Sequence, residues 1–574
     1  MKKILSQLFN RAIIQAFGDD FATVDPLIQR SQRAEFGDFQ ANFAMRLAKQ
    51  LGMKPIEVAK VVVQKLNDPL VLKCEPSGPG FINIFLNDEA LASLLPAMNN
   101  ARLGVEITHQ PETVVVDYAN ANVAKEMHVG HLRSIVIGDA IVRILEFLGH
   151  HVIRQSHLGD FGTQFGMLIE YLLDQGKDPT TYSVSDLDPL YKKSKEQFDL
   201  SDEFKERARN RVVALQQGDE KTLAIWQMLV KNSLQYFQQI YDKLDVLITE
   251  QDARGESFYN FMLKDVVDEL MRLGIAHEDE GAIVVALDEW QDETGKPLVN
   301  IIRKRDGGYL YATTDLATAK FRMNELNATR IIYLTDARQK QHFAMLFATI
   351  KKAGWMPEGV RFEHIPFGAI LGPDNKPFKT RSGESIKLIE LLHEAERRAQ
   401  TIAKNKNPQL SEDDIKHIAH CIGIGALKYA DLRADKIKDY VFDWDKLLSF
   451  EGNTAPYLQN AYVRIASLFR KASLDVESYQ HHHLTICNVY EHQLALQLLS
   501  FDDVLYAVSD NLSLHSLCDY LYDLASLYHR FYEECPILTS DDETRCSRLL
   551  FSALTAQTLK LGLSLLGIGT IERM

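Results

Sequence analysis

The chain has 574 residues, enough for three or four domains of roughly 100–200 residues each. Apolar residues make up 46% of it and charged residues 25%, as in a water-soluble globular protein, and no stretch is long and apolar enough to span a membrane. The net charge of −14 weighs only mildly against a nucleic-acid partner, because binding depends on the local field and not on the sum.

Residues 1–100 are predicted to form a small α+β domain. Apolar side chains recur at approximately helical spacing over 4–17, which indicates an amphipathic helix and not a signal peptide. A second helix is expected over 40–51 and a third from Pro55, a residue favoured in the first turn. Residues 81–85 alternate as a short strand does.

A doubly wound parallel sheet is predicted to begin near residue 110. Residues 114–116 are a buried type of strand, and a helix follows over 132–148. A second strand at 152–153 and a second helix at 165–173 continue the pattern. Strand and helix in alternation are typical of a Rossmann-like sheet.

The alternation stops at residues 177–296, which read as a mostly helical insertion. Strands expected at 299–303, 331–334 and 362–365 return the chain to the same sheet, and from Asp413 onward it reads as almost wholly helical. The predicted fold class is therefore multidomain α/β with an all-α C-terminal domain. The predicted domains are 1–100, a small α+β domain; 110–450, a Rossmann-fold catalytic domain; and 453–574, a helical domain.

The cysteine pattern indicates a reducing compartment. The six cysteines contain no CxxC pair, so reduced thiols in the cytoplasm are expected and structural zinc is not. The histidine run at 481–483 lacks a second ligand cluster and is interpreted as a solvated loop. No residue is assigned as a metal ligand.

The segment 122–134, Asn-Val-Ala-Lys-Glu-Met-His-Val-Gly-His-Leu-Arg-Ser, lies where the first strand of the sheet leads into the first helix. Ligands of open α/β sheets bind at the carboxyl ends of strands, and a helix N-terminus favours phosphate. His128 and His131 stand three residues apart on the entering turn, and Gly130 permits close approach of a ligand. The alternative is a pair of histidines that only cap the helix.

This pattern resembles the first signature of class I aminoacyl-tRNA synthetases, in which both histidines contact ATP phosphates. Small nucleotidylyltransferases carry a similar motif but are much shorter and lack the helical C-terminal region. Segments 116–128, 159–166 and 566–574 resemble the arginyl-tRNA synthetases in particular, and the resemblance covers essentially the whole chain.

The resemblance implies a two-step reaction that uses L-arginine, ATP with Mg²⁺, and tRNA(Arg). Arginine would form arginyl-adenylate and then pass to the terminal 2′-OH of the tRNA. The late loop of class I enzymes corresponds to 376–384, where Lys379 and Arg381 would neutralise pyrophosphate. Its second lysine is missing, and Lys125, just before the histidines, would supply that charge, as in many arginyl enzymes.

A guanidinium requires carboxylates arranged to accept its forked donors. Glu256 and Asp315 are the candidates, and Tyr311 stands one helical turn before Asp315. The resemblance adds Asn122 and Gln339 to this arginine-binding set. Each of these residues alone would read as a surface or capping residue.

The C-terminal domain resembles the anticodon-binding domain of the same family. Tyr457, Gln459 and Arg464 are its candidate tRNA contacts, because aromatic and polar groups stack on and read unpaired bases. Tyr462 is as readily a core residue. The first 90 residues resemble the domain that contacts the tRNA elbow. A monomer is expected, without hydrolytic editing in the insertion.

Two rival hypotheses remain open at the level of sequence. A non-catalytic RNA-binding relative would have lost the histidines or the carboxylates, and both are present. A synthetase for another amino acid would lack two convergent carboxylates.

Overall fold

The computed structural model of the chain describes residues 1–31, 33–176, 184–291, 297–305, 307–378, 385–481 and 483–573. Two compact units divide the chain. One comprises Met1–Ile107, Phe450–Ser564 and Gly569–Met574; the other comprises Thr108–Ser449 and Leu565–Ile568. Each unit is described below by itself.

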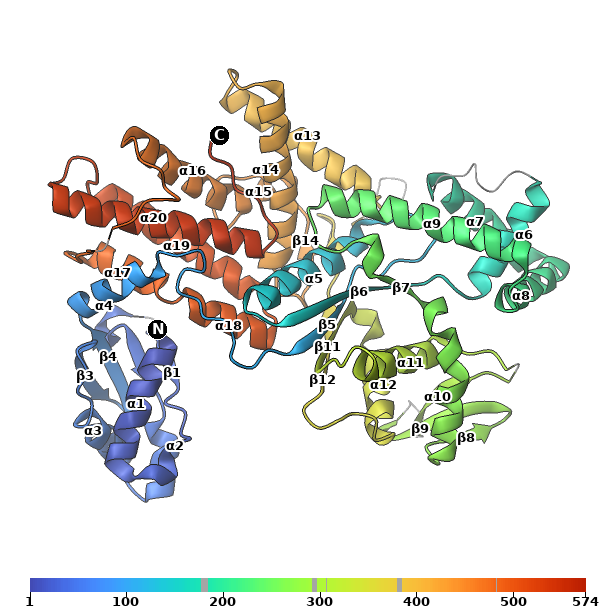
Figure 1. Cartoon of the computed structure of the whole chain (residues 1–574), viewed down its shortest axis with the longest axis horizontal. Helices are drawn as coiled ribbons and strands as arrows, with labels where there is room; N and C mark the ends of the chain where they lie inside the picture. The colour runs from blue at the N-terminus through green and yellow to red at the C-terminus, as the bar shows by residue number, and fades with distance from the viewer. Residues whose placement is uncertain are drawn as a thin grey trace. The chain divides into compact units, whose positions relative to one another are not determined.

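The second unit is built on a five-stranded parallel sheet with the order β12-β11-β5-β6-β7 (Figure 1). The central strand β5 reads Thr-Val-Val-Val-Asp, and its three valines are fully buried, as a strand covered on both faces requires. The strands are β5 (Thr113–Asp117), β6 (His151–Leu158), β7 (Ala253–Gly255), β11 (Arg330–Asp336) and β12 (Arg361–Phe367).

Helices cover both faces of this sheet. The long helix α5 lies on β5, β6 and β11, and α14 packs over α5. On the other face Val115 and Ile331 share one core with α10, α11 and α12. The helices of this layer are α5 (Val129–Phe147), α6 (Thr163–Gln175), α10 (Asn260–Arg272), α11 (Tyr311–Asn324), α12 (Lys340–Lys352), α13 (Leu388–Lys406), α14 (Glu412–Arg433) and the short α15 (Trp444–Leu447).

A buried guanidinium connects the sheet to α11. Arg322 is fully buried; its Nη2 lies 2.7 Å from Asp117 Oδ2 at the end of β5, and its Nε donates to Gln155 Oε1 in β6 at 2.8 Å. The guanidinium also lies 5.0 Å from the centre of the Tyr333 ring in β11. Arg322 thus joins three adjacent strands, and breaking such a buried pair typically costs about 3–5 kcal/mol.

The segment 177–296, predicted as a mostly helical insertion, contains four helices together with strands. The helices are α7 (Val184–Leu200), α8 (Asp202–Gln216), α9 (Glu220–Lys243) and α10 (Asn260–Arg272), and the short strand β7 between α9 and α10 belongs to the parallel sheet. Single turns are η5 (Glu250–Asp252), η6 (Glu256–Tyr259) and, later, η7 (Ala337–Gln339). Strands then form a separate antiparallel sheet of order β10-β9-β8. Its members are β8 (Ala276–Asp279), β9 (Ala282–Gln291) and β10 (Pro297–Arg303).

The prediction that 299–303 continues the parallel sheet is wrong. These residues belong to β10, which pairs antiparallel with β9 immediately before it in the chain. Val299 and Ile301 are 43% and 42% exposed, which is typical of an antiparallel strand with one solvated face. The strands predicted at 331–334 and 362–365 do lie in the parallel sheet. Two further short strands, β13 (Ile370–Leu371) and β14 (Tyr440–Val441), pair with each other in a separate two-stranded sheet.

The first unit begins with a four-stranded antiparallel sheet of order β1-β2-β4-β3 against helices. The amphipathic N-terminal helix, the helix from Pro55 and the strand from Phe81 are confirmed, but the second helix starts at Ala44 because 39–41 pair with β4. The elements are α1 (Lys2–Phe17), η1 (Asp19–Phe21), β1 (Ile28–Arg30), η2 (Ala34–Phe36), β2 (Phe39–Ala41), α2 (Ala44–Leu51), α3 (Pro55–Val63), β3 (Val71–Ser77), β4 (Phe81–Leu86), α4 (Asp88–Leu94) and η3 (Leu95–Met98).

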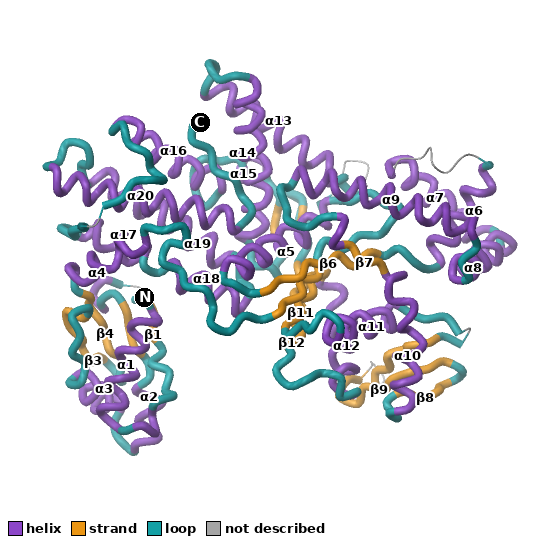
Figure 2. Tube along the Cα trace, viewed as in Figure 1, coloured by secondary structure: helices purple, strands orange, loops and turns teal. Residues whose placement is uncertain are grey.

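The remainder of this unit is a helical bundle, drawn in purple in Figure 2. A predominantly helical C-terminal region was predicted and is confirmed. The helices are α16 (Ala455–Lys471), α17 (Val489–Leu498), α18 (Phe501–Asn511), α19 (His515–Glu534) and α20 (Asp542–Leu565).

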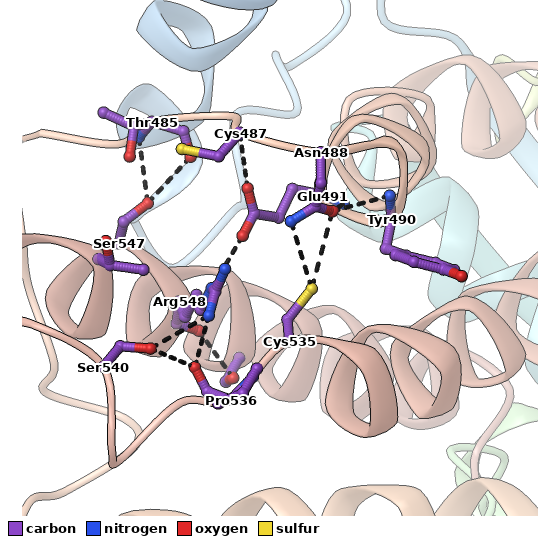
Figure 3. Close-up of polar contacts among 12 residues, drawn as sticks. Thr485, Cys487, Asn488, Tyr490, Glu491, Cys535, Pro536, Ser540, Ser547 and Arg548 are labelled. Carbon is purple, nitrogen blue, oxygen red and sulfur yellow. Dashed lines mark hydrogen bonds and ion pairs between the residues drawn. The ribbon is translucent and has the colours of Figure 1, made fainter.

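A polar network fixes the start of α17 to α20 and α19 (Figure 3). Glu491, which is buried, accepts from Arg548 Nε at 2.8 Å and from the Cys487 backbone at 2.7 Å. Asn488 caps α17 through the backbone N–H groups of the next turn, and its amide contacts Cys535 Sγ at 3.5 Å. Every charged group of this network therefore has a partner of opposite charge or a polar contact.

The sheet and the bundle of this unit are joined by a histidine held between two carboxylates. His492 of α17 lies with Nδ1 2.5 Å from Asp88 and Nε2 2.9 Å from Asp38. Burial alone would lower the pKa of His492, but these two carboxylates raise it above the usual value for histidine. Leu496, one turn further along, packs in the core of the N-terminal sheet.

We expect His492→Gln to destabilise the protein in a pH-dependent manner. A histidine whose pKa is raised on folding contributes fully below its unfolded pKa of about 6.5, and the contribution disappears as the pH rises through the folded pKa. The variant should melt roughly 2–4 °C lower than the parent near pH 6, equivalent to about 1 kcal/mol, with a smaller gap near pH 9.5. His109→Gln, at an exposed histidine, is the control. A gap that stays constant with pH would contradict the charged bridge.

Candidate functional site

The described candidates for ATP and arginine binding lie at the carboxyl edge of the parallel sheet. The chain leaves β5, forms α5 and returns as β6 on one side, whereas β11 lies on the other side of β5. The strand order therefore reverses between β5 and β11, and a crevice at such a switch point is where open α/β sheets bind their ligands. Residues after β5, β6, β7 and β11 all reach this edge (Figure 1).

The two histidines cap the first turn of α5 and fix each other. The Gly130 backbone donates to His128 Nδ1 at 3.1 Å, and the His128 backbone donates to His131 Nδ1 at 3.0 Å. Because Nδ1 of His128 accepts a hydrogen bond, its neutral ring carries the proton on Nε2. Nδ1 of His131 lies 3.0 Å from the His128 backbone nitrogen and 3.2 Å from the His128 carbonyl oxygen, and it accepts from the N–H in the Nε2–H tautomer. Capping and ligand binding are thus compatible, since each ring keeps an Nε2–H donor.

Both rings are held in the neutral form. Burial, with the nearby His128, lowers the pKa of His131 to about 4. Burial also lowers the pKa of His128, together with the positive charges of Arg338 and Lys125. A neutral Nε2–H donor binds a phosphate oxygen without requiring protonation of the ring.

Gly130 leaves space for the ring of His128, which lies in the same helical turn. A Cβ atom at this position would lie 2.9 Å from His128 Cε1 and 3.0 Å from Nδ1. The His128 ring can therefore fold back over the first turn of α5 only if residue 130 is glycine. Glycine at position 130 is therefore needed to accommodate the His128 ring. This reason is additional to the one suggested by the sequence, which is that glycine lets a ligand approach closely.

The loop between β5 and α5 is held in a constrained conformation. Ala119 and Ala124 have φ of 60° and 63°, which is uncommon for residues other than glycine. Their backbone N–H groups donate to buried Ser134 Oγ at 3.0 Å and Ser233 Oγ at 2.9 Å. Such strain persists only where the surroundings impose it, and it is typical of functional loops.

Of the three candidate cations, Lys125 alone belongs to the described residues. Lys125 Nζ lies 4.2 Å from the centre of the Tyr191 ring of α7. Lys379 and Arg381 lie outside the described residues, but the segment after them is described. There the backbones of Val129 and Leu388 donate to Ile386 and Met127, each at 2.9 Å, so this segment pairs with the start of α5.

The two predicted carboxylates are close enough to interact through their charges. Glu256 follows β7, and Asp315 lies in the second turn of α11. Burial raises the pKa of Glu256 to about 8, with further contributions from the negative charges of Asp315 and Asp160. A cation bound beside Glu256 would favour its charged form and lower this pKa again.

Histidine and tyrosine side chains surround Asp315. Its Oδ2 lies 2.6 Å from His342 Nε2, and its Oδ1 lies 3.8 Å from His157 Nε2. Tyr311 packs edge-on against His342, with the ring centres 4.8 Å apart, and is itself 61% exposed. The i, i+4 spacing of Tyr311 and Asp315 in one helix is confirmed.

Asn122 and Gln339 lie at the same edge of the sheet. Asn122 pairs with Gly159 after β6, where an added Cβ would lie 2.3 Å from Asn122 Oδ1. Gln339 ends the single turn η7 after β11, and its side chain is exposed. Both positions fit the predicted pocket, but no contact joins either of them to Glu256 or Asp315.

Three residues of this pocket were not identified from the sequence. Asp160 lies within the segment 159–166, His157 stands two residues before it, and His342 stands three residues after Gln339, but no spacing rule marked them. Their signal is spatial, because each contacts a residue far away in the chain.

The predicted tRNA contacts lie in the other unit. Tyr457 Oη lies 2.9 Å from His529 Nδ1, and the exposed Arg464 lies over the Tyr532 ring, 5.9 Å from guanidinium carbon to ring centre. Gln459, in contrast, is fully buried, and its amide donates to Gly569 O at 2.8 Å. Tyr462 is also buried, which agrees with the alternative interpretation that it is a core residue.

Two negative findings concern the described part of the chain. It contains no group of three or more His, Cys, Asp or Glu side chains placed to hold a metal ion. None of its helices combines the length and the apolar character needed to cross a bilayer.

The fold and the site together define a class I tRNA synthetase. The family described as "tRNA synthetases class I (R), catalytic domain" matches residues 93–444. An "Arginyl tRNA synthetase N terminal domain" matches 3–86, and a "DALR anticodon binding domain" matches 458–574.

Comparison with relatives and solved structures shows which kind of class I tRNA synthetase the chain resembles. The chain is 49% identical to arginine–tRNA ligases of Klebsiella pneumoniae subsp. pneumoniae and Escherichia coli, over 100% of both chains in each case. It resembles the arginyl-tRNA synthetase structure of Plasmodium falciparum with a TM-score of 0.85 and 31% identity, covering 100% of this chain and 99% of the other. The Thermus thermophilus structure, 24% identical with a TM-score of 0.82 and covering 99% and 100%, shares the fold. The chain belongs to the arginine–tRNA ligase family.

We expect nitrogen-detected NMR of histidine-labelled protein to show neutral Nε2–H rings at His128 and His131 at pH 7. Backbone N–H groups that donate to both Nδ1 atoms favour this tautomer, and His131 should titrate near pH 4. His128→Asn and His131→Asn identify the two signals. A pKa at or above 6.5 for His131, or protons on Nδ1, would contradict the capping geometry.

Proposed function

We propose that the chain catalyses the ATP-dependent ligation of L-arginine to tRNA(Arg), with arginyl-adenylate as the intermediate and the 2′-OH of the terminal adenosine as the acceptor. Two carboxylates that interact through their charges, Glu256 and Asp315, support this proposal most directly, together with the two histidines at the first turn of α5. The 49% identity to arginine–tRNA ligases over the full chain supports it independently. No side chain needs to act as a nucleophile, because positioning and charge stabilisation are sufficient.

His128 and His131 are proposed to bind the phosphates of ATP through Nε2–H. Lys125, Lys379 and Arg381 would neutralise the leaving pyrophosphate. Mg²⁺ would arrive as Mg-ATP; its ligands would be phosphate oxygens and water, since this ion is commonly held through substrate phosphates.

The arginine pocket is proposed to consist of Glu256, Asp315, Tyr311, Asn122 and Gln339. A planar guanidinium can satisfy two carboxylates at once, whereas a lysine ammonium is a point charge on a shorter reach. A carboxylate left unpaired in a buried site costs about 1–3 kcal/mol or more. The pocket would thus reject lysine by geometry, although the charges are equal, and no editing step would be required.

Tyr457 and Arg464 are the proposed tRNA contacts of the helical domain. Tyr457 lies beside His529, and Arg464 beside Tyr532, which gives an aromatic and basic surface of the kind that stacks on unpaired bases. Gln459 is omitted from this proposal because its buried amide binds the C-terminal segment. The N-terminal domain is proposed to contact the tRNA elbow.

A cytoplasmic monomer is the proposed working form. All site residues of the proposed pocket come from one chain, so a second copy is not needed to complete it. The six cysteines are unpaired thiols, as a reducing compartment favours.

The proposed function is tested by ATP–pyrophosphate exchange and tRNA charging with each of the twenty amino acids, with and without total tRNA. Arginine alone should support both reactions. Equal or greater charging with another amino acid would contradict the arginine assignment. Failure of every amino acid, with ATP bound normally, would favour a non-catalytic RNA-binding relative.

We expect His128→Asn and His131→Asn each to lower the rate of arginine activation by roughly 10²–10³, because each removes one donor to charge that develops in the transition state, a loss of about 2.7–4 kcal/mol. Single-turnover adenylate formation measures the effect. Thermal unfolding provides the control, since Nδ1 of each ring also caps α5. A double variant with near-parental rates would remove the case for this phosphate site.

We expect the KM for arginine to fall by roughly tenfold between about pH 6.5 and about pH 8.5. Glu256, with a pKa of about 8 in the free pocket, must lose its proton to pair with the guanidinium. Below that pKa the pocket is protonated and binds weakly; above it the KM levels off.

Glu256→Gln is the matched variant for this profile. It should raise the KM for arginine by about tenfold or more at pH 8.5 and flatten its pH dependence, with the KM for ATP little changed. A pH profile that persists in the variant would show that Glu256 is not the group that titrates.

A further inference from the structure

Asp160 holds the turn that carries Glu256. It directly follows β6 and Gly159, and it is 4% exposed. Its Oδ1 accepts the Ser257 backbone N–H at 2.9 Å, and its Oδ2 accepts the Ser257 hydroxyl at 2.6 Å. Both carboxylate oxygens are therefore engaged by the residue after Glu256.

The same carboxylate lies directly against the residue before Glu256. A Cβ atom at Gly255 would lie 2.0 Å from Asp160 Oδ2 and 2.3 Å from its Cγ, distances that no side chain can occupy. Gly255 has an ordinary φ of −70°, so the backbone conformation does not require glycine here. The close approach of Asp160 requires it.

Glu256 thus stands between two residues that Asp160 fixes. The edge strand β7 has three residues and leads straight into the single turn η6, so local secondary structure supplies little rigidity of its own. Asp160 is in turn anchored from the insertion, where Trp226 Nε1 of α9 donates to its carbonyl oxygen at 2.7 Å.

The second carboxylate of the proposed pocket, Asp315, is held in place by other contacts. Asp315 lies on a regular helix and accepts its contact from His342 of α12 at 2.6 Å. Asp315 therefore does not depend on Asp160, and loss of Asp160 should disturb only one side of the guanidinium site.

We propose that Asp160 is a positioning residue for the choice of amino acid: its carboxylate clamps Gly255 and Ser257, so that Glu256 meets the guanidinium while Asp160 itself does not bind it. The proposal rests on the arginine pocket proposed above. At metal sites, residues that hold a ligating carboxylate in place typically matter by about 10–100-fold in affinity, and we expect an effect of similar size here.

Charge and clamping are separated by three substitutions. Asp160→Ala removes both. Asp160→Asn removes the charge but keeps an oxygen for the Ser257 backbone and an amide for its hydroxyl. Gly255→Ala removes neither charge nor hydrogen-bonding group and only displaces the carboxylate.

We expect Asp160→Ala and Gly255→Ala to raise the KM for arginine by about tenfold or more, with the KM for ATP within about twofold. Asp160→Asn should stay within about threefold, and Ser257→Ala, which loses one of the two bonds, should lie between. Asp252→Ala is the control: this carboxylate caps the turn before β7, at the Thr249 backbone, 2.8 Å away. It should leave the KM for arginine unchanged.

Each outcome bears on one proposal. If Asp160→Asn is as harmful as Asp160→Ala while Gly255→Ala is mild, Asp160 acts by its charge and the positioning role is wrong. Suppose that Glu256→Gln raises the KM for arginine but Gly255→Ala, Ser257→Ala and Asp160→Ala do not. The proposed arginine pocket is then supported, and the proposed positioning role of Asp160 is wrong. If Glu256→Gln also has no effect, the pocket proposal fails, and the clamp fails with it. Should Asp160→Ala not fold, as melting would reveal, Gly255→Ala and Ser257→Ala decide.

Discussion

The buried guanidinium of Arg322 is the interaction on which the site depends. It joins Asp117 at the end of β5, Gln155 in β6 and the Tyr333 ring of β11, directly beneath the edge where the site lies. Arg322 stands seven residues after Asp315 in α11, so two helical turns separate the anchor from the carboxylate on the same side of the helix. The order of the strands and the placement of Asp315 are therefore fixed together, and a shift of either would move the carboxylate relative to the histidines after β5.

The two halves of the site differ in their electrostatics. After β5, neutral imidazoles present N–H donors, with Lys125 and Arg338 close enough to lower the pKa of His128. After β6, β7 and in α11, three carboxylates gather, and their mutual repulsion with burial raises the pKa of Glu256. A substrate with a cationic side chain and an anionic carboxylate would align between these halves, its carboxylate toward the phosphates. Alignment by fixed charges requires no reorganisation during the reaction, which is the efficient form of electrostatic catalysis.

The sequence predicted the parts of this structure that local pattern determines. The valine run of β5, the long helix after it and the histidines at its first turn are all read from adjacent residues, and they are confirmed. β10 was assigned to the wrong sheet because an alternating strand does not reveal its partner; β9, not β11, pairs with it. Asp160 was missed because its role arises from an approach to Gly255 almost one hundred residues later, and Gln459 was misread because Gly569 covers it. Contacts between residues that lie so far apart in the chain cannot be recognised from the spacing or composition of the sequence.

A crystal structure of the chain with L-arginine and a non-hydrolysable ATP analogue is the most direct test of the proposed site. The guanidinium should lie within hydrogen-bond distance of both Glu256 and Asp315, and phosphate oxygens should face Nε2 of His128 and His131. The Asp160 carboxylate should remain on Ser257 and Gly255 and should not contact the ligand. A guanidinium bound elsewhere, with Glu256 and Asp315 unoccupied, would contradict the central claim that these two carboxylates select the amino acid.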